Sequence, residues 1–468
     1  MPAGSVHRPV ASGLLAPASG SKSRLRFTSK RRILRDLLQY PALRMDWFGR
    51  AKIDFTTAPK SLALRDNAGK ATNLLQICRD SVPPCNLNPL LFNGHLQTVW
   101  TAAVAHGPPV HYKRRIFEAD HPQFKGSFAV DFVTEPSADS DESLPPRTTY
   151  FSKEELTQIA SDDSRPMLVV LHGLTGGSHE IYLRHAIKSL VDEGKWEICV
   201  VNSRGCAKSK ITTGLFYNAR ATWDTRQVVK WLRKTYPSRP LFGLGFSLGA
   251  NILTNYIGEE GEDCQFKAAV VISNPWNLEI GNKALKSTWI GHEIYLKTLG
   301  TSLRTLVNNN KAEIEKYSEV SLSELSKVKY LYEFDRAYQC PTWGYPTEDA
   351  YYRDASSVDS LLSVRIPLLA LNAVDDPIAV NLGLPYNEAT KNPYTVLCTT
   401  SLGGHIGWFE PLGGRWHGKP VCNFLNHMAF EIDHSSIDTG AREVAYSTAA
   451  STSEFNPIRR KLDVKLHF

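Results

Sequence analysis

The chain has 468 residues, of which 42% are hydrophobic and 22% are charged, and its formal net charge is +7. This composition is that of a soluble globular protein, and the length suffices for one large domain with extensions or for two smaller domains. No run of about 18 or more apolar residues is present, which excludes a membrane-spanning helix by sequence, and we expect no secretory signal because the N-terminus lacks a continuous apolar segment with a cleavage site.

The positive charge lies at the N-terminus. Residues 1–35 contain eight Lys and Arg and no Asp or Glu, so the rest of the chain carries 46 basic against 47 acidic side chains. That balance excludes a broad phosphate-binding surface, and we expect no nucleic-acid partner. For the basic segment three interpretations stay open: a mitochondrial transit sequence, a short basic helix ("SKRRILRDLLQY") on an anionic membrane or lipid-droplet surface, and a solvated extension.

Eight cysteines are scattered along the chain without a C-x-x-C pair. Several stand within apolar runs, as in "EICVV" and "TVLCTT", which indicates buried free thiols in a reducing compartment. We therefore expect an intracellular protein, either cytoplasmic or associated with mitochondria or lipid droplets. We expect no metal site and no cofactor.

Residues 1–85 are interpreted as an N-terminal extension, basic and partly disordered, because their periodicity is weak. The segments "HYKRRIFEA" and "FAVDFVTE" alternate polar and apolar residues, which predicts an antiparallel pair of strands. The polar, acidic stretch at about 135–165 is interpreted as a solvated loop. The main domain is placed at 86–433, and 434–468 is interpreted as a polar C-terminal tail.

Apolar strands then alternate with amphipathic helices. The expected strands are "PMLVVLHGL", "WEICVVNS", "PLFGLGFS", "KAAVVISNP", "IPLLALNAVDD" and "YTVLCTTSLGGH". The expected helices are "HEIYLRHAIKSLVDEG", "ATWDTRQVVKWLRKTY", "LGANILTNYIGEEG" and "KPVCNFLNHMAFEI". This order predicts an α/β fold with a mostly parallel sheet and helices on both faces.

The alternation pauses at about 275–360, which is predicted to form a helical lid insertion over the end of the sheet. Four of its aromatic residues suit an acyl-chain pocket: Trp289, Tyr330, Tyr332 and Trp343. Packing of these rings against the sheet is an equal alternative.

A G-x-S-x-G sequence, "GFSLG" at 245–249, joins the strand "PLFGLGF" to the helix "LGANIL". A turn of this kind strains the backbone at its apex, so it needs small residues such as Gly245 and Gly249 beside it. It presents the hydroxyl of Ser247 at the carboxyl end of a strand, as a nucleophile requires. A dinucleotide loop is disfavoured, because the next glycine falls four residues after Gly245 instead of three.

A serine nucleophile needs a base and an acid, which follow the serine in chain order in this arrangement. The strand that ends in "NAVDD" supplies Asp375 and Asp376, and the next strand leads into His405 on a glycine turn. His405 is the predicted base. Asp376, directly before a proline, is the preferred acid, and Asp375 stays an alternative.

A tetrahedral oxyanion requires two backbone donors. One predicted donor is the N–H of Leu248, directly after the serine. The other is the N–H of Leu174, in the loop "LHGLTGGS" (171–178) after an earlier strand. This loop is not a phosphate-binding loop, since no lysine follows it.

With these motifs the chain resembles the α/β-hydrolase superfamily and, within it, the YheT-like (AB hydrolase 4) branch, which includes fungal medium-chain fatty acid ethyl ester synthase/esterases and animal ABHD-type lipid hydrolases. The matching segments span about 90–430: "FNGHLQTVW" (92–100), "LHGLTGGSHEIY" (171–182), "NSRGCAKS" (202–209), "GFSLGANIL" (245–253), "FDRAYQCPTWGYPTEDAYYRDAS" (334–356), "NAVDDP" (372–377) and "GGHIGWFE" (403–410). The resemblance implies Ser247 as nucleophile, Asp376 as acid and His405 as base. It also implies hydrolysis or alcoholysis of medium-chain acyl esters, acylglycerols or acyl-CoA thioesters.

The expected function is that of a serine esterase and acyltransferase that works through an acyl-enzyme. Its expected partners are an acyl ester or acyl-CoA together with an alcohol or water, and the basic N-terminal segment is a candidate for peripheral membrane or lipid-droplet contact. Two alternatives stay open: an acylglycerol or phospholipid lipase of the same fold, and a non-catalytic binding or scaffold protein.

Overall fold

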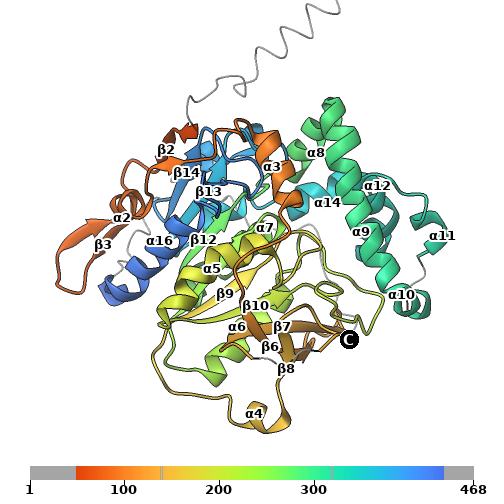
Figure 1. The fold of residues 1–468 in the computed structure, drawn as a ribbon, viewed down its shortest axis with the longest axis horizontal. Coiled ribbons are helices and arrows are strands. Elements are labelled where there is room, and N and C mark those ends of the chain that lie inside the picture. Colours follow the sequence, from red (N-terminus) through yellow and green to blue (C-terminus); the bar gives the residue numbers. More distant parts are fainter. Residues whose placement is uncertain (1–48, 138, 140, 318–319, 437–468) are drawn as a thin grey trace, which may run out of the picture. The chain divides into compact units, whose positions relative to one another are not determined.

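A ten-stranded mixed sheet organises the part of the chain that the computed structural model describes, residues 49–436 without 138, 140, 318 and 319 (Figure 1). Its strands follow the order β2-β14-β13-β12-β11-β9-β10-β7-β6-β8. The interpretations of the basic segment and of most of the C-terminal tail fall on 1–48 and 437–468, outside the described residues.

Six neighbouring strands are parallel and form the centre of the sheet. They are β10 (Glu197–Asn202), β9 (Met167–Leu171), β11 (Leu241–Phe246), β12 (Phe266–Ile272), β13 (Leu368–Ala373) and β14 (Thr395–Thr400). Every residue of β9, β11, β13 and β14 is buried, which requires cover on both faces of the sheet. The predicted α/β fold with a mostly parallel sheet is confirmed.

Two groups of helices contribute to this cover. In one group α16 (Gly418–Phe430) packs on α5 (Ile181–Glu193) and on α2 (Leu74–Ser81). In the other, α7 (Leu248–Glu260) packs on β11 and on α6 (Trp223–Thr235). Ten of the 13 residues of α7 are buried, because this helix has neighbours on nearly all sides.

Residues 50–86, most of which we expected to belong to an extension, take part in the fold. Strand β2 (Ile53–Thr57) pairs antiparallel with β14 and forms one edge of the sheet. Two small pairs accompany it: β1 (Arg50–Ala51) with β5 (Cys85–Asn86), and β3 (Ala63–Arg65) with β4 (Ala71–Asn73). The described domain therefore begins well before residue 86. Its first strands are short and partly exposed, which gives them a weak hydrophobic pattern.

The other edge of the sheet contains the antiparallel pair that the sequence predicts, β6 (His111–Glu118) and β7 (Ser127–Thr134). The acidic stretch expected to be a solvated loop contributes a strand as well. Within it, β8 (Thr148–Tyr150) pairs parallel with β6, and α4 (Lys153–Thr157) follows.

A helical insertion lies between β12 and β13, as predicted. Its α-helices are α8 (Leu278–Ser287), α9 (Lys297–Asn309), α10 (Lys311–Tyr317), α11 (Leu322–Leu325), α12 (Leu331–Phe334), α13 (Cys340–Trp343) and α14 (Glu348–Ala355). Two π-helical turns, Gly291–Leu296 and Asp335–Gln339, join some of them. In Figure 1 the insertion forms the green to cyan helices on the right, next to α3 (Gly94–Ala103).

The four aromatic residues expected to line one acyl pocket have different surroundings. Trp343 packs with its ring centroid 5.2 Å from those of Phe124 and Trp223. Tyr330 and Tyr332 stack on each other, and Trp289 is 72% exposed. Trp343 is therefore a packing residue, although its ring neighbours lie on α6 and in the loop before β7 and not on the sheet, and the four rings do not form a common pocket.

All eight cysteines are free thiols, and all of them except Cys264 are buried. Across the described ranges, no helix is both long enough and apolar enough to cross a bilayer.

Candidate active site

Ser247 stands at the turn between β11 and α7 with φ 49° and ψ −119°, a backbone conformation that side-chain-bearing residues rarely adopt. The residues two positions before and after it must be glycine for steric reasons. A Cβ at Gly245 would lie 2.7 Å from Cα of Ala250, and a Cβ at Gly249 would lie 2.4 Å from the carbonyl oxygen of His172. The close packing of α7 against the end of β9 thus fixes where the serine hydroxyl points.

Two residues from the ends of later strands extend a hydrogen-bonded chain from this hydroxyl. His405, after β14, has Nε2 2.8 Å from Oγ of Ser247 and Nδ1 2.8 Å from Oδ2 of Asp376, after β13. The Asp376 carboxylate is fully buried, and its Oδ1 accepts hydrogen bonds from the N–H groups of Ile378 and Ala379, each at 2.8 Å. The structure brings together the three residues that the sequence singled out.

Asp375, the alternative acid, has a different role in this geometry. Its Oδ1 accepts a hydrogen bond from the N–H of Gly404 at 2.9 Å. Burial raises the pKa of the Asp375 carboxyl to about 7. Asp375 therefore contacts the backbone beside His405, while Asp376 contacts the imidazole.

The loop that carries His405 is fixed by side chains from several elements. After the bond from Gly404 to Asp375, the next two N–H groups donate to hydroxyls: that of His405 to Oγ1 of Thr98 at 2.9 Å, and that of Ile406 to Oγ of Ser273 at 3.1 Å. Arg415 donates to the carbonyl of Ile406. Because Gly404, Ile406 and Trp408 have positive φ angles, this strained loop depends on such contacts.

Thr98 and Gly94, both on α3, were not identified as functional by the sequence reasoning. A Cβ at Gly94 would lie 1.9 Å from the carbonyl oxygen of Asp375, so α3 packs directly on the loop that carries the two aspartates. Thr98 also donates to the carbonyl of Gly94 at 2.6 Å. The segment "FNGHLQTVW", noted only for its resemblance, was the available signal.

The loop that contains Leu174 lies against the serine, since a Cβ at Gly173 would be 3.4 Å from Cβ of Ser247. The N–H groups on either side of Leu174 are bound by tyrosine hydroxyls. Gly173 donates to Oη of Tyr182, and Thr175 donates to Oη of Tyr217, each at 2.8 Å. Within the described residues the N–H of Leu174 has no such acceptor, and neither has that of Leu248 at the start of α7.

A family model described as alpha/beta hydrolase fold matches residues 166–411, from the start of β9 to the loop after His405. The chain belongs to the α/β-hydrolase family.

Alignments with individual known proteins cover more of the chain than this match does. The monoacylglycerol lipase of Saccharomyces cerevisiae is 36% identical over 402 residues, which cover 80% of this chain and 88% of the relative. The medium-chain fatty acid ethyl ester synthase/esterase 2 of the same yeast is 32% identical, covering 72% of this chain and 84% of that protein. The human phospholipase ABHD3 is also 32% identical, covering 69% and 73%.

In this α/β hydrolase, the loop around Leu174 is supported by a buried cluster of polar groups at Asp131. The carboxylate of Asp131 accepts hydrogen bonds from Arg114 at 2.6 and 2.8 Å, from Oγ of Ser178 at 2.6 Å and from Nδ2 of Asn202 at 2.8 Å. One of these bonds reaches Oδ1 and three reach Oδ2, and together they offset the cost of burying the charge. The end of the loop at Ser178 is fixed as a result.

His172, at the start of the same loop, is a structural histidine. Its Nδ1 donates to the carbonyl of Gly173 at 2.6 Å, and its Nε2 accepts from the N–H of Ser203 at 3.0 Å. Burial lowers the pKa of His172 to about 4, so the ring is neutral near pH 7.

In the described part of the chain no cluster of three or more His, Cys, Asp or Glu is arranged to hold a metal ion.

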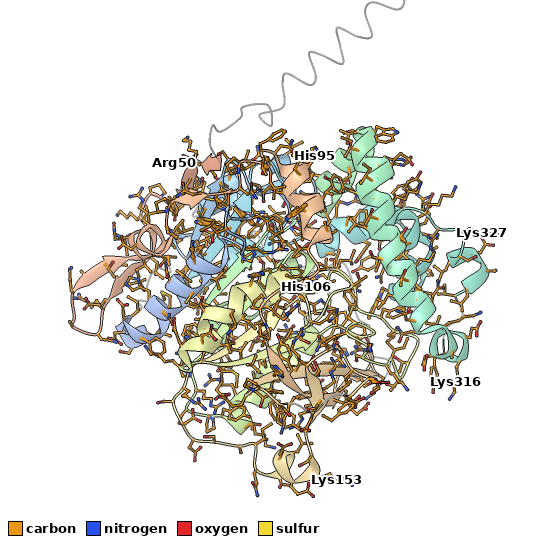
Figure 2. All side chains as sticks on the ribbon, in the orientation of Figure 1. Arg50, His95, His106, Lys153, Lys316 and Lys327 are labelled. Atoms are coloured by element: carbon orange, nitrogen blue, oxygen red, sulfur yellow. The ribbon has the colours of Figure 1, made fainter. Side chains whose placement is uncertain are left out.

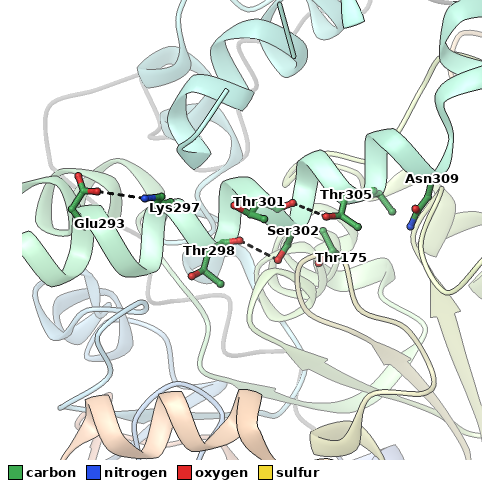
Figure 3. A pocket seen from close by; sticks show the side chains of 9 residues that line it. Thr175, Glu293, Lys297, Thr298, Thr301, Ser302, Thr305 and Asn309 are labelled. Carbon is green, nitrogen blue, oxygen red and sulfur yellow. Dashed lines mark hydrogen bonds and ion pairs between the residues drawn. The ribbon is translucent and has the colours of Figure 1, made fainter. Parts of the chain in front are cut away.

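A cavity of about 540 Å³ opens beside this loop of the hydrolase (Figure 3). Five of its nine lining residues carry a hydroxyl group: Thr175, Thr298, Thr301, Ser302 and Thr305. At one end the ammonium group of Lys297 lies 3.9 Å from the carboxylate of Glu293. This open cavity is therefore lined by a mixture of hydroxyl and aliphatic groups, and none of the four aromatic residues expected to form an acyl pocket is among its lining residues.

Proposed function

We propose that this α/β hydrolase is a serine esterase with acyl-transfer capacity that acts on medium-chain acyl esters. Ser247 is the nucleophile, His405 the general base and Asp376 the acid that orients His405. One observation carries the proposal: Nε2 of His405 is 2.8 Å from the Ser247 hydroxyl while its Nδ1 is 2.8 Å from a buried carboxylate. A hydroxyl becomes an effective nucleophile near neutral pH only with such a base.

In the first half of the reaction, Oγ of Ser247 attacks the acyl carbonyl carbon as its proton passes to Nε2 of His405. The carboxylate of Asp376 accepts the Nδ1–H bond and stabilises the imidazolium that forms. The proton on Nε2 then passes to the leaving alcohol or thiol, and the acyl group stays on Ser247. In the second half, water or an alcohol gives its proton to Nε2 as it attacks the acyl carbon. The bond from the acyl carbon to Oγ then breaks, and Oγ of Ser247 takes the proton back from Nε2.

The negative oxygen of each tetrahedral intermediate needs two N–H donors, which we assign to Leu174 and Leu248. Support for Leu174 comes from its neighbours, whose N–H groups already donate to Tyr182 and Tyr217. Leu248 is the first residue of α7, where the N–H has no acceptor within the helix. Donors that are fixed before the reaction lower the barrier because they need no reorientation.

Labelling with a fluorophosphonate probe tests the nucleophile. We expect the wild-type chain to be labelled and Ser247→Ala to be unlabelled. Ser287→Ala, which removes an exposed serine at the end of α8, serves as the matched control and should label like wild type. Absence of labelling in wild type, or equal labelling of Ser247→Ala, would refute the proposal and favour a binding protein with a hydrolase fold.

Acyl transfer is tested separately. Because the acyl-enzyme reacts with either water or alcohol, ethyl ester and free acid are measured together in ethanol–water mixtures, with medium-chain acyl substrates and Ser247→Ala as the blank. We expect both products. Free acid as the sole product would restrict the proposal to hydrolysis.

Hydrolysis of acylglycerols is a second candidate function, and the cavity beside Thr175 favours it. A glycerol group both donates and accepts hydrogen bonds, which matches a wall of threonine and serine hydroxyls. Lys297 and Glu293 neutralise each other at its end, so the cavity offers no excess of positive charge for a phosphate. We place the alcohol portion of a neutral acylglycerol here.

A further inference from the structure

Large apolar side chains are exposed near the carboxyl ends of the central strands. The described residues include thirteen exposed large hydrophobic side chains. Six of them form what we call the apolar rim, which comes from α3 with its preceding loop and from the segment after α8: Phe92, Val99, Trp100, Trp289, Ile290 and Ile294. Single exposed apolar residues are ordinary, but a cluster of this kind indicates a binding surface.

The two halves of the rim meet at a direct contact. Nδ1 of His95, on α3, lies 2.8 Å from Oη of Tyr295, and the two rings stack with centroids 5.7 Å apart. Val99 stands one helical turn after His95, and Ile294 directly precedes Tyr295. Figure 2 shows His95 where α3 approaches the helices of the insertion. The two segments that carry the rim, far apart in the sequence, therefore meet at this contact.

Three further leucines of the described part are highly exposed. Leu90, 80% exposed, lies just before Phe92, and the neighbouring Asn88 donates to the carbonyl of Phe409, in the loop that also carries the fully exposed Leu412. Leu382, 78% exposed, follows β13. Leu90 therefore adds to the rim beside Phe92, and Leu412 lies in a loop that is hydrogen-bonded to the same segment.

This surface lies next to the candidate active site. The helix that carries half of the rim packs on Asp375 through Gly94 and binds the N–H of His405 through Thr98. The other half begins within the insertion that also carries the cavity wall on α9. A binding partner that covers the rim therefore lies close enough to Ser247 to supply substrate or to accept product.

The charges around the rim favour a partner that is apolar and negatively charged. Acidic groups nearby are paired with cations: Glu293 with Lys297 and Glu279 with Lys283. The segment 1–48, which precedes the described part, carries nine basic and two acidic side chains. It joins the described part at Gly49, whose carbonyl accepts a hydrogen bond from the N–H of Leu87, three residues before Leu90.

We propose that the apolar rim docks on the surface of a phospholipid bilayer that contains anionic lipids. Tryptophan, phenylalanine and isoleucine side chains bind at the boundary between headgroups and acyl chains. A basic segment joined to the chain next to the rim adds attraction to anionic headgroups. This step rests on the proposed function: if the substrate is a lipid ester, it is dissolved in the bilayer, and docking brings the active site to that bilayer.

Flotation of the full-length chain with vesicles tests the docking. One set of vesicles is phosphatidylcholine alone and the other also contains phosphatidylserine. We expect binding to the second set, and a loss of about tenfold or more in the bound fraction for the double variant Trp100→Ser/Trp289→Ser, because both rings then leave the interface. The matched control is Ile116→Ser/Tyr317→Ser, which removes two exposed apolar side chains outside the rim and should bind like wild type.

Two further measurements keep the result interpretable. Hydrolysis of a water-soluble short-chain ester should be equal in wild type and Trp100→Ser/Trp289→Ser, which shows that the variant is folded and separates failure of docking from failure of the proposed function. Equal flotation of the rim variant and the wild type would overturn the proposal. So would a wild-type dimer in analytical ultracentrifugation that the rim variant converts to a monomer, because the rim would then join two copies of the chain.

Discussion

Oδ2 of Asp376 lies 2.8 Å from Nδ1 of His405, whereas the neighbouring Asp375 accepts a hydrogen bond from the backbone of Gly404. Of these two adjacent carboxylates, Asp376 binds the imidazole of His405 and Asp375 binds the loop that carries it. We expect Asp376→Asn to lower kcat by about 10⁴-fold, because the imidazole loses its charged partner. Asp375→Asn keeps an oxygen for Gly404 and should cost less than about tenfold. Steady-state kinetics on one ester decide the matter, and the reverse ranking would assign the acid to Asp375.

The buried Asp375 also gives the stability of the protein a pH dependence. Burial raises its pKa from 3.8 to about 7 in the folded chain, so between these values the folded state binds more protons than the unfolded state. The free energy of unfolding contributed by this group therefore falls as the pH rises from about 4 to about 7.

Asp375→Asn removes this titration. We expect the wild type to lose stability, relative to the variant, on going from pH 5 to pH 8, as measured by urea unfolding at each pH. The difference in unfolding free energy between wild type and variant is compared at the two pH values. If this difference is the same at both, Asp375 does not titrate in this range.

Thr98 connects α3 to the backbone of His405. Thr98→Val removes the oxygen that accepts from the His405 N–H and leaves that buried donor without a partner, which costs about 1–3 kcal/mol of stability. Misplacement of the base should lower kcat by about tenfold to a hundredfold with little change in KM. Thr98→Ser keeps the hydroxyl and should restore most of the activity. Equal activity of the valine variant and the wild type would argue against a positioning role.

The sequence predicted Ser247 and His405 because their surroundings are local patterns. Glycines beside a serine at a strand–helix junction, and a glycine turn after the last strand, can be recognised within a few residues. Asp375 and Asp376 could not be separated, since consecutive side chains at a strand end point in different directions and the direction depends on the turn. Thr98 could not be predicted from any local pattern, because its partner His405 lies 307 residues away.

The sheet shows the same division between local and long-range information. The six central strands are continuous apolar runs and were predicted, while β2 and β8 were missed because both are short edge strands. The aromatic residues of the insertion were assigned to a pocket on composition alone. Which rings pack inward, as Trp343 does, and which face solvent, as Trp289 does, is decided by the tertiary arrangement of the helices.

The hydroxyls of Tyr182 and Tyr217 position the loop between them by accepting from Gly173 and Thr175. Replacement of both tyrosines by phenylalanine should loosen the N–H of Leu174 and lower kcat by up to about 10²-fold, the loss typical of one oxyanion donor. Tyr338→Phe serves as the control, because it removes a tyrosine–backbone hydrogen bond elsewhere, to Gly214. Affinity for a transition-state-like boronic acid should fall in parallel with kcat. A fall in kcat with unchanged boronate affinity would contradict this assignment.

The hydroxyl-lined cavity makes a prediction about the alcohol side of the ester. In α9, Ser302 and Thr305 donate to helix carbonyls one turn earlier, so their oxygens remain acceptors, while Thr298 and Thr301 keep a free proton within the described contacts. The double variant Thr298→Val/Thr301→Val removes those two donors with little change in shape. Each lost hydrogen bond to a substrate hydroxyl costs about 0.5–1.5 kcal/mol.

We therefore expect this variant to raise KM for a monoacylglycerol by about fivefold to a hundredfold, and to leave KM for the ethyl ester of the same fatty acid unchanged, since ethanol has no further hydroxyl to bind. Thr157→Val, on the distant helix α4, is the matched control and should change neither value. Equal effects on both esters would show that α9 contacts the acyl chain or only supports the fold. A larger effect on a lysophospholipid than on the monoacylglycerol would instead indicate that the cavity receives a phosphorylated headgroup.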